Sequence, residues 1–136
     1  VVDESGRTGI ERVLAVGDCA TVRLPTGDFA RLESVHNAIE QAKTAAAVIA
    51  DAPLPIKRAP WFWSDQFDMK LQIAGETGAD TAIEVDGALE SEKFVALHRL
   101  NGRVVGVTTV NEPGRFMKWR GALDKGEDSI SQPGAP

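Results

Sequence analysis

The chain has little of what marks several large classes of protein. It contains one cysteine, Cys19, among 136 residues, which excludes an internal disulfide, a CxxC redox pair and a cysteine-rich metal site. It has no basic excess, because 20 Asp and Glu outnumber 15 Lys and Arg for a net charge of −5. This balance argues against a nucleic-acid partner. No apolar run approaches the length of a membrane span, and no secretory signal opens the chain. We therefore expect a cytoplasmic protein that binds neither nucleic acid nor membrane.

The overall composition is that of an ordinary folded protein. Apolar residues make up 43% and charged residues 26% of the chain. This length and balance fit one domain, or one small domain plus a remnant of another. The chain begins Val1-Val2-Asp3 with no initiator methionine, and we expect it to be cut from something longer.

The first part of the sequence predicts a strand followed by a helix. Residues 12–16 are typical of a short buried strand, with apolar residues from Val13 to Val16, and Gly17-Asp18 ends it. A polar loop over residues 21–32 follows, with a turn at Pro25-Thr26-Gly27. A helix should begin near Ser34, a suitable N-cap. Apolar residues recur behind it at three- and four-residue steps, giving one apolar face: Val35, Ala38, Ile39, Ala42, Ala46 and Ile49.

The second part predicts an antiparallel arrangement of strands. Alternation over residues 69–73 indicates a half-buried strand, and another around Ile83 and Val85 should end in an Asp86-Gly87 turn. Two longer strands flank Asn101-Gly102, a dipeptide that favours the left-handed dihedrals of a tight hairpin. A final helix can open at Pro113, and three apolar residues share its inner face: Phe116, Trp119 and Leu123.

Two stretches of the first part could bind a ligand, and each has a purely structural alternative. In Gly17-Asp18-Cys19, the glycine lets a ligand approach the backbone, and an aspartate at a strand end can bind a sugar hydroxyl. The alternative is an ordinary turn aspartate beside a small buried cysteine. Residues 31–38 place a helix N-terminus just downstream, where unpaired N–H groups attract anionic atoms. The alternative there is an ordinary helix cap.

A third stretch, residues 60–66, reads Pro-Trp-Phe-Trp-Ser-Asp-Gln. A proline-bounded aromatic loop of this kind could stack on a flat ring, and the alternative is a linker anchored in the core by its aromatics. We expect Phe62 to be such an anchor and leave both readings open for Trp61 and Trp63. Neither histidine has the spacing of a metal ligand, and His98 is expected to be a packed or surface residue.

Together the three stretches resemble, in order and spacing, the C-terminal third of the flavin-dependent ferredoxin reductases that serve dioxygenases and cytochromes P450. The matching text is VLAVGDCA, RLESVHNAIEQA, APWFWSDQFDMKLQIAG and VVGVTTVN, within about residues 1 to 125. The two dinucleotide-binding halves of that family are absent, and the chain contains no G-x-G-x-x-G fingerprint.

The resemblance implies a fold and a division of the chain. Residues 1–52 would be the end of an α/β FAD-binding domain, and residues 53–60 a proline-containing linker. Residues 61–125 would be an α+β C-terminal domain, with an antiparallel sheet covered by helix. The polar stretch 126–136 would be a flexible tail.

The resemblance also implies roles for individual residues. Asp18 would hold the ribityl chain of FAD, and the helix after Ser34 would point its N-terminus at the N1/O2 edge of the isoalloxazine. Trp63 would lie beside the ring, and Trp61 would help to shape the same wall. The residues assigned to the cofactor in this way are Gly17, Asp18, Glu33, Ser34, Val35, Trp61 and Trp63.

The implied parent enzyme takes a hydride from NAD(P)H onto FAD and passes single electrons to a 2Fe–2S ferredoxin. This chain lacks the nicotinamide site and most of the FAD site, so we expect it to be inactive alone, with no catalytic residue or metal ligand of its own. Its partners would be the ferredoxin and the missing N-terminal domains. The alternative is a non-catalytic interaction or dimerisation module that forms a homo-oligomer. The related disulfide reductases are disfavoured because they need a cysteine pair.

Overall fold

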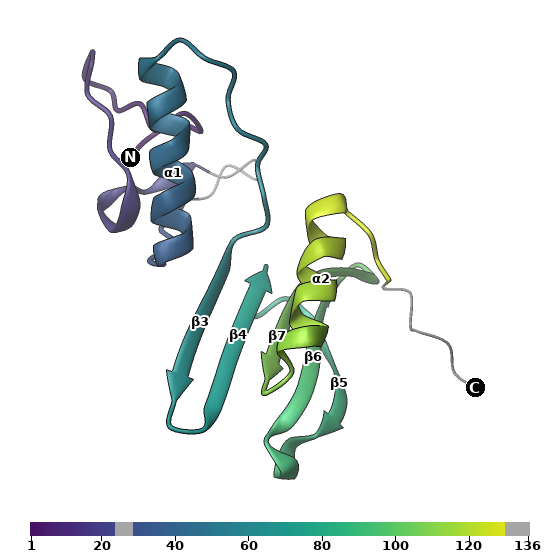
Figure 1. The fold of residues 1–136 in the computed structure, drawn as a ribbon. Coiled ribbons are helices and arrows are strands. Elements are labelled where there is room, and N and C mark those ends of the chain that lie inside the picture. The colour runs from purple at the N-terminus through teal and green to yellow at the C-terminus, as the bar shows by residue number, and fades with distance from the viewer. Residues whose placement is uncertain (24–28, 130–136) are drawn as a thin grey trace. The chain divides into compact units, whose positions relative to one another are not determined.

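The computed structural model describes residues 1–23 and 29–129. The chain forms two compact units, Val1–Lys57 and Arg58–Pro136 (Figure 1). The turn predicted at Pro25-Thr26-Gly27 lies outside the described residues, as does the predicted tail from residue 130 onward. Within the described ranges, no helix is long and apolar enough to cross a membrane.

The first unit is built around one long helix. Its elements are the 3-10 helix η1 (Gly17–Cys19), the short strands β1 (Val22–Arg23) and β2 (Phe29–Ala30), and the helix α1 (Val35–Ile49). The side chain of Ser34 accepts a hydrogen bond from the backbone N–H of Asn37 at 3.2 Å, which confirms the predicted helix start and its cap. β1 and β2 pair antiparallel, so part of the predicted loop is a small ribbon.

The buried strand predicted at residues 12–16 is wrong. Leu14 makes a single antiparallel bridge, to Arg7, and Val13 is 43% exposed. A strand needs a partner along its whole length to satisfy its backbone groups, and the described residues supply that partner at one position. An apolar run in the sequence reports the tendency to be buried but does not supply the neighbour.

The predicted apolar face of α1 exists but is largely exposed. Val35 is 62%, Ile39 48% and Ile49 76% exposed, whereas Ala45 is buried. Periodicity shows which side of a helix is apolar, but it does not show what that side packs against. In this unit the helix packs through its small residues instead.

The second unit is a five-stranded antiparallel sheet with one helix, which confirms the predicted α+β class. The strand order is β3-β4-β7-β6-β5, and Figure 1 shows α2 lying over one face of the sheet. The elements are β3 (Trp61–Gln66), β4 (Met69–Gly75), β5 (Ala82–Ala88), η2 (Leu89–Ser91), β6 (Lys93–Leu100), β7 (Arg103–Val110) and α2 (Pro113–Lys125).

One predicted turn of this sheet is confirmed and another is wrong. Asn101 and Gly102 both adopt positive φ, at 52° and 83°, and join β6 to β7 as the tight hairpin that the sequence predicts. The turn predicted at Asp86-Gly87 is instead part of β5, where Gly87 pairs with Phe94. A Cβ at Gly87 would lie 2.8 Å from the carbonyl oxygen of Lys93. Glycine therefore serves a close strand approach here, not a reversal of the chain.

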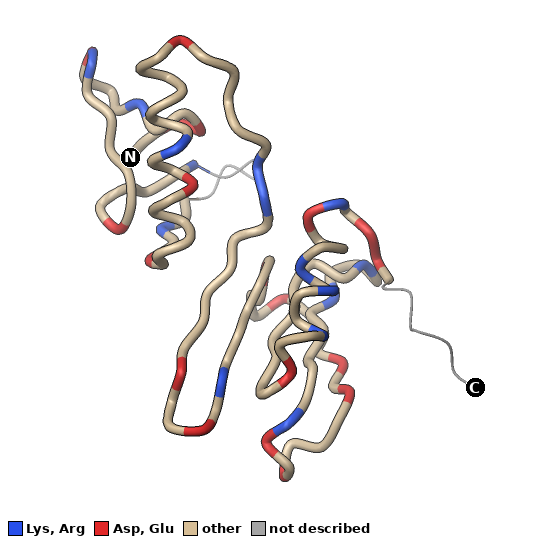
Figure 2. Tube along the Cα trace, in the orientation of Figure 1, with Lys and Arg blue, Asp and Glu red and all other residues tan. Residues whose placement is uncertain are grey.

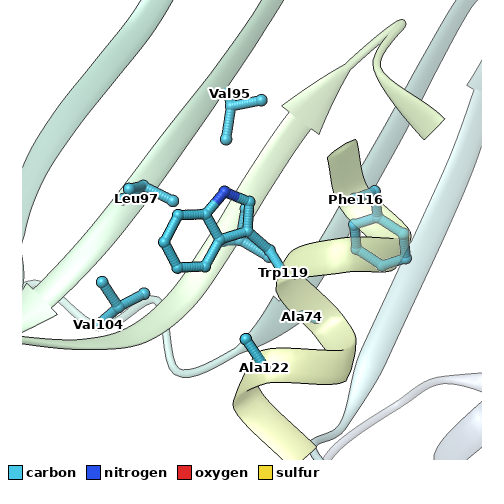
Figure 3. Packing of buried hydrophobic residues seen from close by; sticks show 8 residues of the cluster. Ala74, Val95, Leu97, Val104, Phe116, Trp119 and Ala122 are labelled. Carbon is cyan, nitrogen blue, oxygen red and sulfur yellow. The ribbon is translucent and has the colours of Figure 1, made fainter. Parts of the chain in front are cut away.

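The hydrophobic core lies between α2 and the sheet. Phe116 is fully buried and Trp119 is 6% exposed, and Figure 3 shows the Trp119 indole extending from the helix toward Val95 and Leu97. Leu123 is partly buried against the same core, so the predicted inner face of α2 is confirmed. The buried members of this cluster are Ala74, Val95, Leu97, Val104, Val107, Phe116, Trp119 and Ala122.

His98 is a packed residue of β6 whose hydrogen bonds define its tautomer. The hydroxyl of Thr81 donates to the carbonyl of Gly78 at 2.7 Å. Because that proton is already used, His98 Nδ1, 3.3 Å from Thr81 Oγ1, is assigned as a donor. His98 Nε2, 2.9 Å from Thr108 Oγ1, then accepts from that hydroxyl. The ring is therefore held as the neutral Nδ1–H form.

Acidification should destabilise the chain through His98. Burial lowers the pKa of His98 from its ordinary value of 6.5, because desolvation disfavours the charged imidazolium. The unfolded chain then binds more protons than the folded one below pH 6.5, so the stability present above that pH is lost as the pH falls through the lowered pKa. Urea unfolding at a series of pH values should show this loss. In the His98→Gln variant, the part of this acid-induced fall in the free energy of unfolding that is due to His98 should disappear. In the His36→Gln variant it should remain. The same dependence of unfolding free energy on pH in the parent chain and in both variants would contradict the role of His98.

Candidate functional site

The turn that carries Asp18 is docked on the first turns of α1. Gly17 opens η1 with a φ of 76°, and its backbone N–H donates to the side-chain oxygen of Gln41 at 2.6 Å. A Cβ at Gly17 would lie 3.5 Å from the Cβ of Ala38. The side chain of Asp18 is exposed beside this contact. Gln41, which the sequence analysis missed, therefore helps to place Asp18 against the helix.

The residues before α1 support its N-terminus. Ser34 caps the helix, and the side-chain amide of Asn37 donates to the carbonyl of Leu32 at 2.8 Å. Glu33 pairs with Arg31 at 2.7 Å, and both of these side chains are 55% exposed. The first-turn N–H groups of a helix lack partners within the helix and carry partial positive charge. The N-terminus of α1 can therefore stabilise an electronegative group.

These features fit the flavin in chemical terms. An exposed carboxylate accepts hydrogen bonds from hydroxyl groups, as a ribityl chain would offer. A helix N-terminus stabilises negative charge, as the edge of a reduced isoalloxazine would carry. The structure brings Gly17, and with it Asp18, against the first turns of α1 in the first unit, although Gly17 and Gln41 are 24 residues apart in sequence.

The aromatic segment is a strand, so the predicted loop at residues 60–66 is wrong. β3 pairs with β4 from Trp61↔Ala74 to Gln66↔Met69. Side chains alternate between the two faces of a strand, so Trp61 and Trp63 share one face and Phe62 lies on the other. Phe62 is 42% exposed. The expectation that Phe62 anchors the segment in the core is therefore wrong too.

Trp61 and Trp63 form a stack, called here the indole stack. Their ring centroids are 4.9 Å apart, with planes inclined by 28°. Trp61 also contacts Phe116 of the core, at a centroid distance of 5.8 Å, and is partly buried. Trp63 is 36% exposed. The inner ring is anchored in the core, and the outer ring is partly exposed.

Arg120 completes this cluster and was missed by the sequence analysis. Its guanidinium carbon lies 4.8 Å from the ring centroid of Trp61. The sequence feature that could have revealed Arg120 is its position four residues after Phe116, because this spacing puts both side chains on the same side of α2. Basic residues recur along α2, as Figure 2 shows, so charge alone does not distinguish Arg120 from its neighbours.

Two other expectations concern metals and cysteine. In the part of the chain that the structure describes, no group of three or more His, Cys, Asp or Glu side chains is arranged to hold a metal ion. Cys19 is exposed, so the expectation that it is a small buried residue is wrong. Its Sγ lies 3.3 Å from the carbonyl oxygen of Val16, which is the contact that the η1 turn provides.

Residues 61–133 match the family described as Reductase C-terminal, and this match covers more than half of the chain. The chain belongs to the Reductase C-terminal family. The sheet, α2 and the indole stack all lie within the matched residues, whereas Asp18 and α1 precede them. The resemblance seen in the sequence is confirmed.

Relatives extend the match across both units. The chain is 43% identical over 125 residues to rhodocoxin reductase from Rhodococcus erythropolis, covering 90% of this chain and 29% of that protein. It is 38% identical over 117 residues to putidaredoxin reductase from Pseudomonas putida, covering 85% and 28%. Against the reductase in the crystal structure of the covalent putidaredoxin reductase–putidaredoxin complex, the TM-score is 0.88 at 32% identity, covering 95% of this chain and 31% of that one. The chain thus spans less than a third of the length of these relatives.

Proposed function

We propose that this chain is the C-terminal part of an FAD-dependent NAD(P)H:ferredoxin reductase, a flavoprotein oxidoreductase. The observation that carries the proposal is the match to rhodocoxin reductase over 90% of the chain, which includes the Asp18 turn, the start of α1 and the indole stack. We also propose the division into residues 1–52, 53–60, 61–125 and 126–136. Because the nicotinamide site and most of the FAD site lie elsewhere in such a protein, the chain alone is inactive.

In the first unit, the proposed task is to hold the cofactor. Asp18 accepts hydrogen bonds from the ribityl hydroxyls, and Gly17 lets the cofactor approach the backbone. Glu33, Ser34 and Val35 lead into the helix whose N-terminus stabilises negative charge on the ring. FAD, when bound, accepts a hydride from NAD(P)H and releases electrons one at a time. The protein's contribution is orientation and electrostatics.

In the second unit, the proposed task is to form one wall beside the ring. Trp63 offers the exposed face of the indole stack, and Trp61 fixes it to the core through Phe116. An aromatic wall can shield a flavin from water without adding a titratable group. In this proposal Trp63 lies on the side of the flavin that faces the ferredoxin.

The proposed electron acceptor is a 2Fe–2S ferredoxin. Support comes from the structural match to a reductase that forms a complex with putidaredoxin. Lys57 and Arg58 precede β3, and Lys57 is 79% exposed, so this segment could attract an acidic ferredoxin. We propose the cytoplasm as the compartment because one cysteine in 136 residues suits a reducing environment.

Two substitutions in the full-length reductase test the assignment. Asp18→Ala should lower flavin occupancy after purification, because the cofactor loses a hydrogen-bond acceptor. Trp63→Ala should keep the flavin, shift its absorption spectrum and slow ferredoxin reduction more than hydride uptake. Stopped-flow measurement separates the two half-reactions. Full occupancy in Asp18→Ala, or an unchanged spectrum and unchanged half-reactions in Trp63→Ala, would remove that residue from the site.

The alternative of a non-catalytic interaction module has a separate test. The exposed apolar side of α1 is the feature that favours it, because a second copy of the chain could cover this side. A purified chain that is colourless and dimeric at micromolar concentration would support the module. A yellow, monomeric chain would support retained binding of flavin.

A further inference from the structure

The side chain of Arg120 is held in an unusual way for a cation. Its Nε is buried and has no hydrogen-bond partner, and no carboxylate within residues 1–23 and 29–129 lies at salt-bridge distance from its guanidinium. Arg120 is half-buried, and a charged group taken partly out of water is normally paired with an anion. Here the Trp61 ring, 4.8 Å from the guanidinium carbon, takes the place of the anion.

The ring under Arg120 is also the inner member of the indole stack. The contacts of Trp61 include the guanidinium at 4.8 Å, the Trp63 ring at 4.9 Å and the Phe116 ring at 5.8 Å. Phe116 is fully buried and belongs to α2, as Arg120 does. Two side chains of α2, one turn apart, thus contact Trp61. Trp61 in turn contacts Trp63 and so links α2 to it.

We propose that Arg120 is a positioning residue that fixes the indole stack and, through Trp61, the orientation of Trp63. A guanidinium plane over an indole face is attracted by the ring's negative quadrupole and restricts the ring to one tilt. Trp63, which is partly exposed, depends on that ring for its own orientation. The part of the proposal that concerns electron transfer rests on the proposed function; the part that concerns the stack does not.

The stack can be measured in this chain by circular dichroism, because two indoles in contact give an exciton couplet. Trp63→Phe, which removes one of the two indoles, defines the signal without the stack. Arg120→Met keeps most of the unbranched apolar stem of the side chain but removes the charge and the guanidinium plane. We expect its couplet to fall by about twofold or more. Arg120→Lys restores the charge without the plane and should recover part of the signal.

Lys118→Met is the matched control, because Lys118 is exposed on the same helix. This variant should leave the couplet unchanged. A normal couplet in a folded Arg120→Met protein, or equal couplets in Arg120→Lys and Arg120→Met, would overturn the positioning role. If Arg120→Met does not fold, Arg120→Gln replaces it. A normal couplet in Arg120→Gln, or one equal to that of Arg120→Lys, would then overturn the positioning role. A merely structural role would alter the unfolding midpoint but would not make the couplet depend on charge.

The full-length reductase separates this inference from the proposed function. If Trp63→Ala slows ferredoxin reduction, Arg120→Met should slow it too, by a smaller factor, with hydride uptake unchanged. Normal ferredoxin reduction in Arg120→Met beside a slow Trp63→Ala would overturn the link between Arg120 and electron transfer. Normal rates in both variants would count against the proposed role of Trp63, and the couplet alone would then decide whether Arg120 positions the stack.

Discussion

Gly106→Ala should prevent the second unit from folding, or destabilise it by about 3 kcal/mol or more. A Cβ at Gly106 would lie 2.1 Å from the carbonyl oxygen of Glu76 and 2.8 Å from its carbonyl carbon. Both are backbone atoms that cannot move aside as a flexible side chain would. The Glu76 segment is also fixed, because its backbone N–H donates to the carbonyl of Val105 at 2.8 Å. Relief of the clash would require breaking the connection between β4 and β7.

Urea unfolding and amide hydrogen exchange of the 136-residue chain would measure this effect. Gly121→Ala is the matched control, because nothing lies within 4 Å of a Cβ at that helical position. It should stabilise the chain by about 0.5 to 1 kcal/mol, the cost of glycine relative to alanine inside a helix. A folded Gly106→Ala protein with the stability of the parent would show that the Glu76 backbone does not lie against Gly106.

Trp119→Ala should lower the free energy of unfolding by about 3 to 5 kcal/mol. Trp119 is 6% exposed, and Figure 3 shows its indole beside Val95, Leu97 and Val104. Removing the ring loses its burial and leaves a cavity between α2 and the sheet that these neighbours fill only in part. The loss is a large share of the stability of a small domain.

Trp63→Ala is the control for this prediction, since it removes the same side chain from a position that is 36% exposed. Its loss of stability should be clearly smaller, and the two variants should differ in the midpoint of urea unfolding at constant slope. Similar losses in both would mean that Trp63 is a packing residue. That result would also weaken its assignment to the cofactor wall.

Local signals account for the parts of the fold that the sequence predicted well. The hairpin at Asn101-Gly102 depends on two residues that tolerate positive φ, and both adopt it. The start of α1 depends on a hydroxyl that reaches an N–H three residues away. The start of α2 depends on a proline at its first position. Each of these preferences acts within a few residues, so it can be seen without knowledge of the tertiary structure.

The errors arose where a distant segment decides the outcome. Residues 12–16 have the composition of a buried strand, but a strand forms only beside a partner, and Leu14 meets one at a single bridge. Gly87 looked like a turn residue, although the glycine is required by the approach of Lys93 from the neighbouring strand. Proline and aromatics at residues 60–66 suggested a loop, but pairing with β4 makes the segment an edge strand.

The candidate site shows the same division. By itself, the sequence determined which residue types stand before α1 and in the aromatic segment, and their order was enough to suggest the family. Only the tertiary structure decided that Gln41 holds Gly17, that Trp61 and Trp63 share a face while Phe62 does not, and that Arg120 lies over Trp61. The physical reason is that hydrogen bonds and ring contacts between elements depend on register and on helix docking, which are set by the packing of the whole unit.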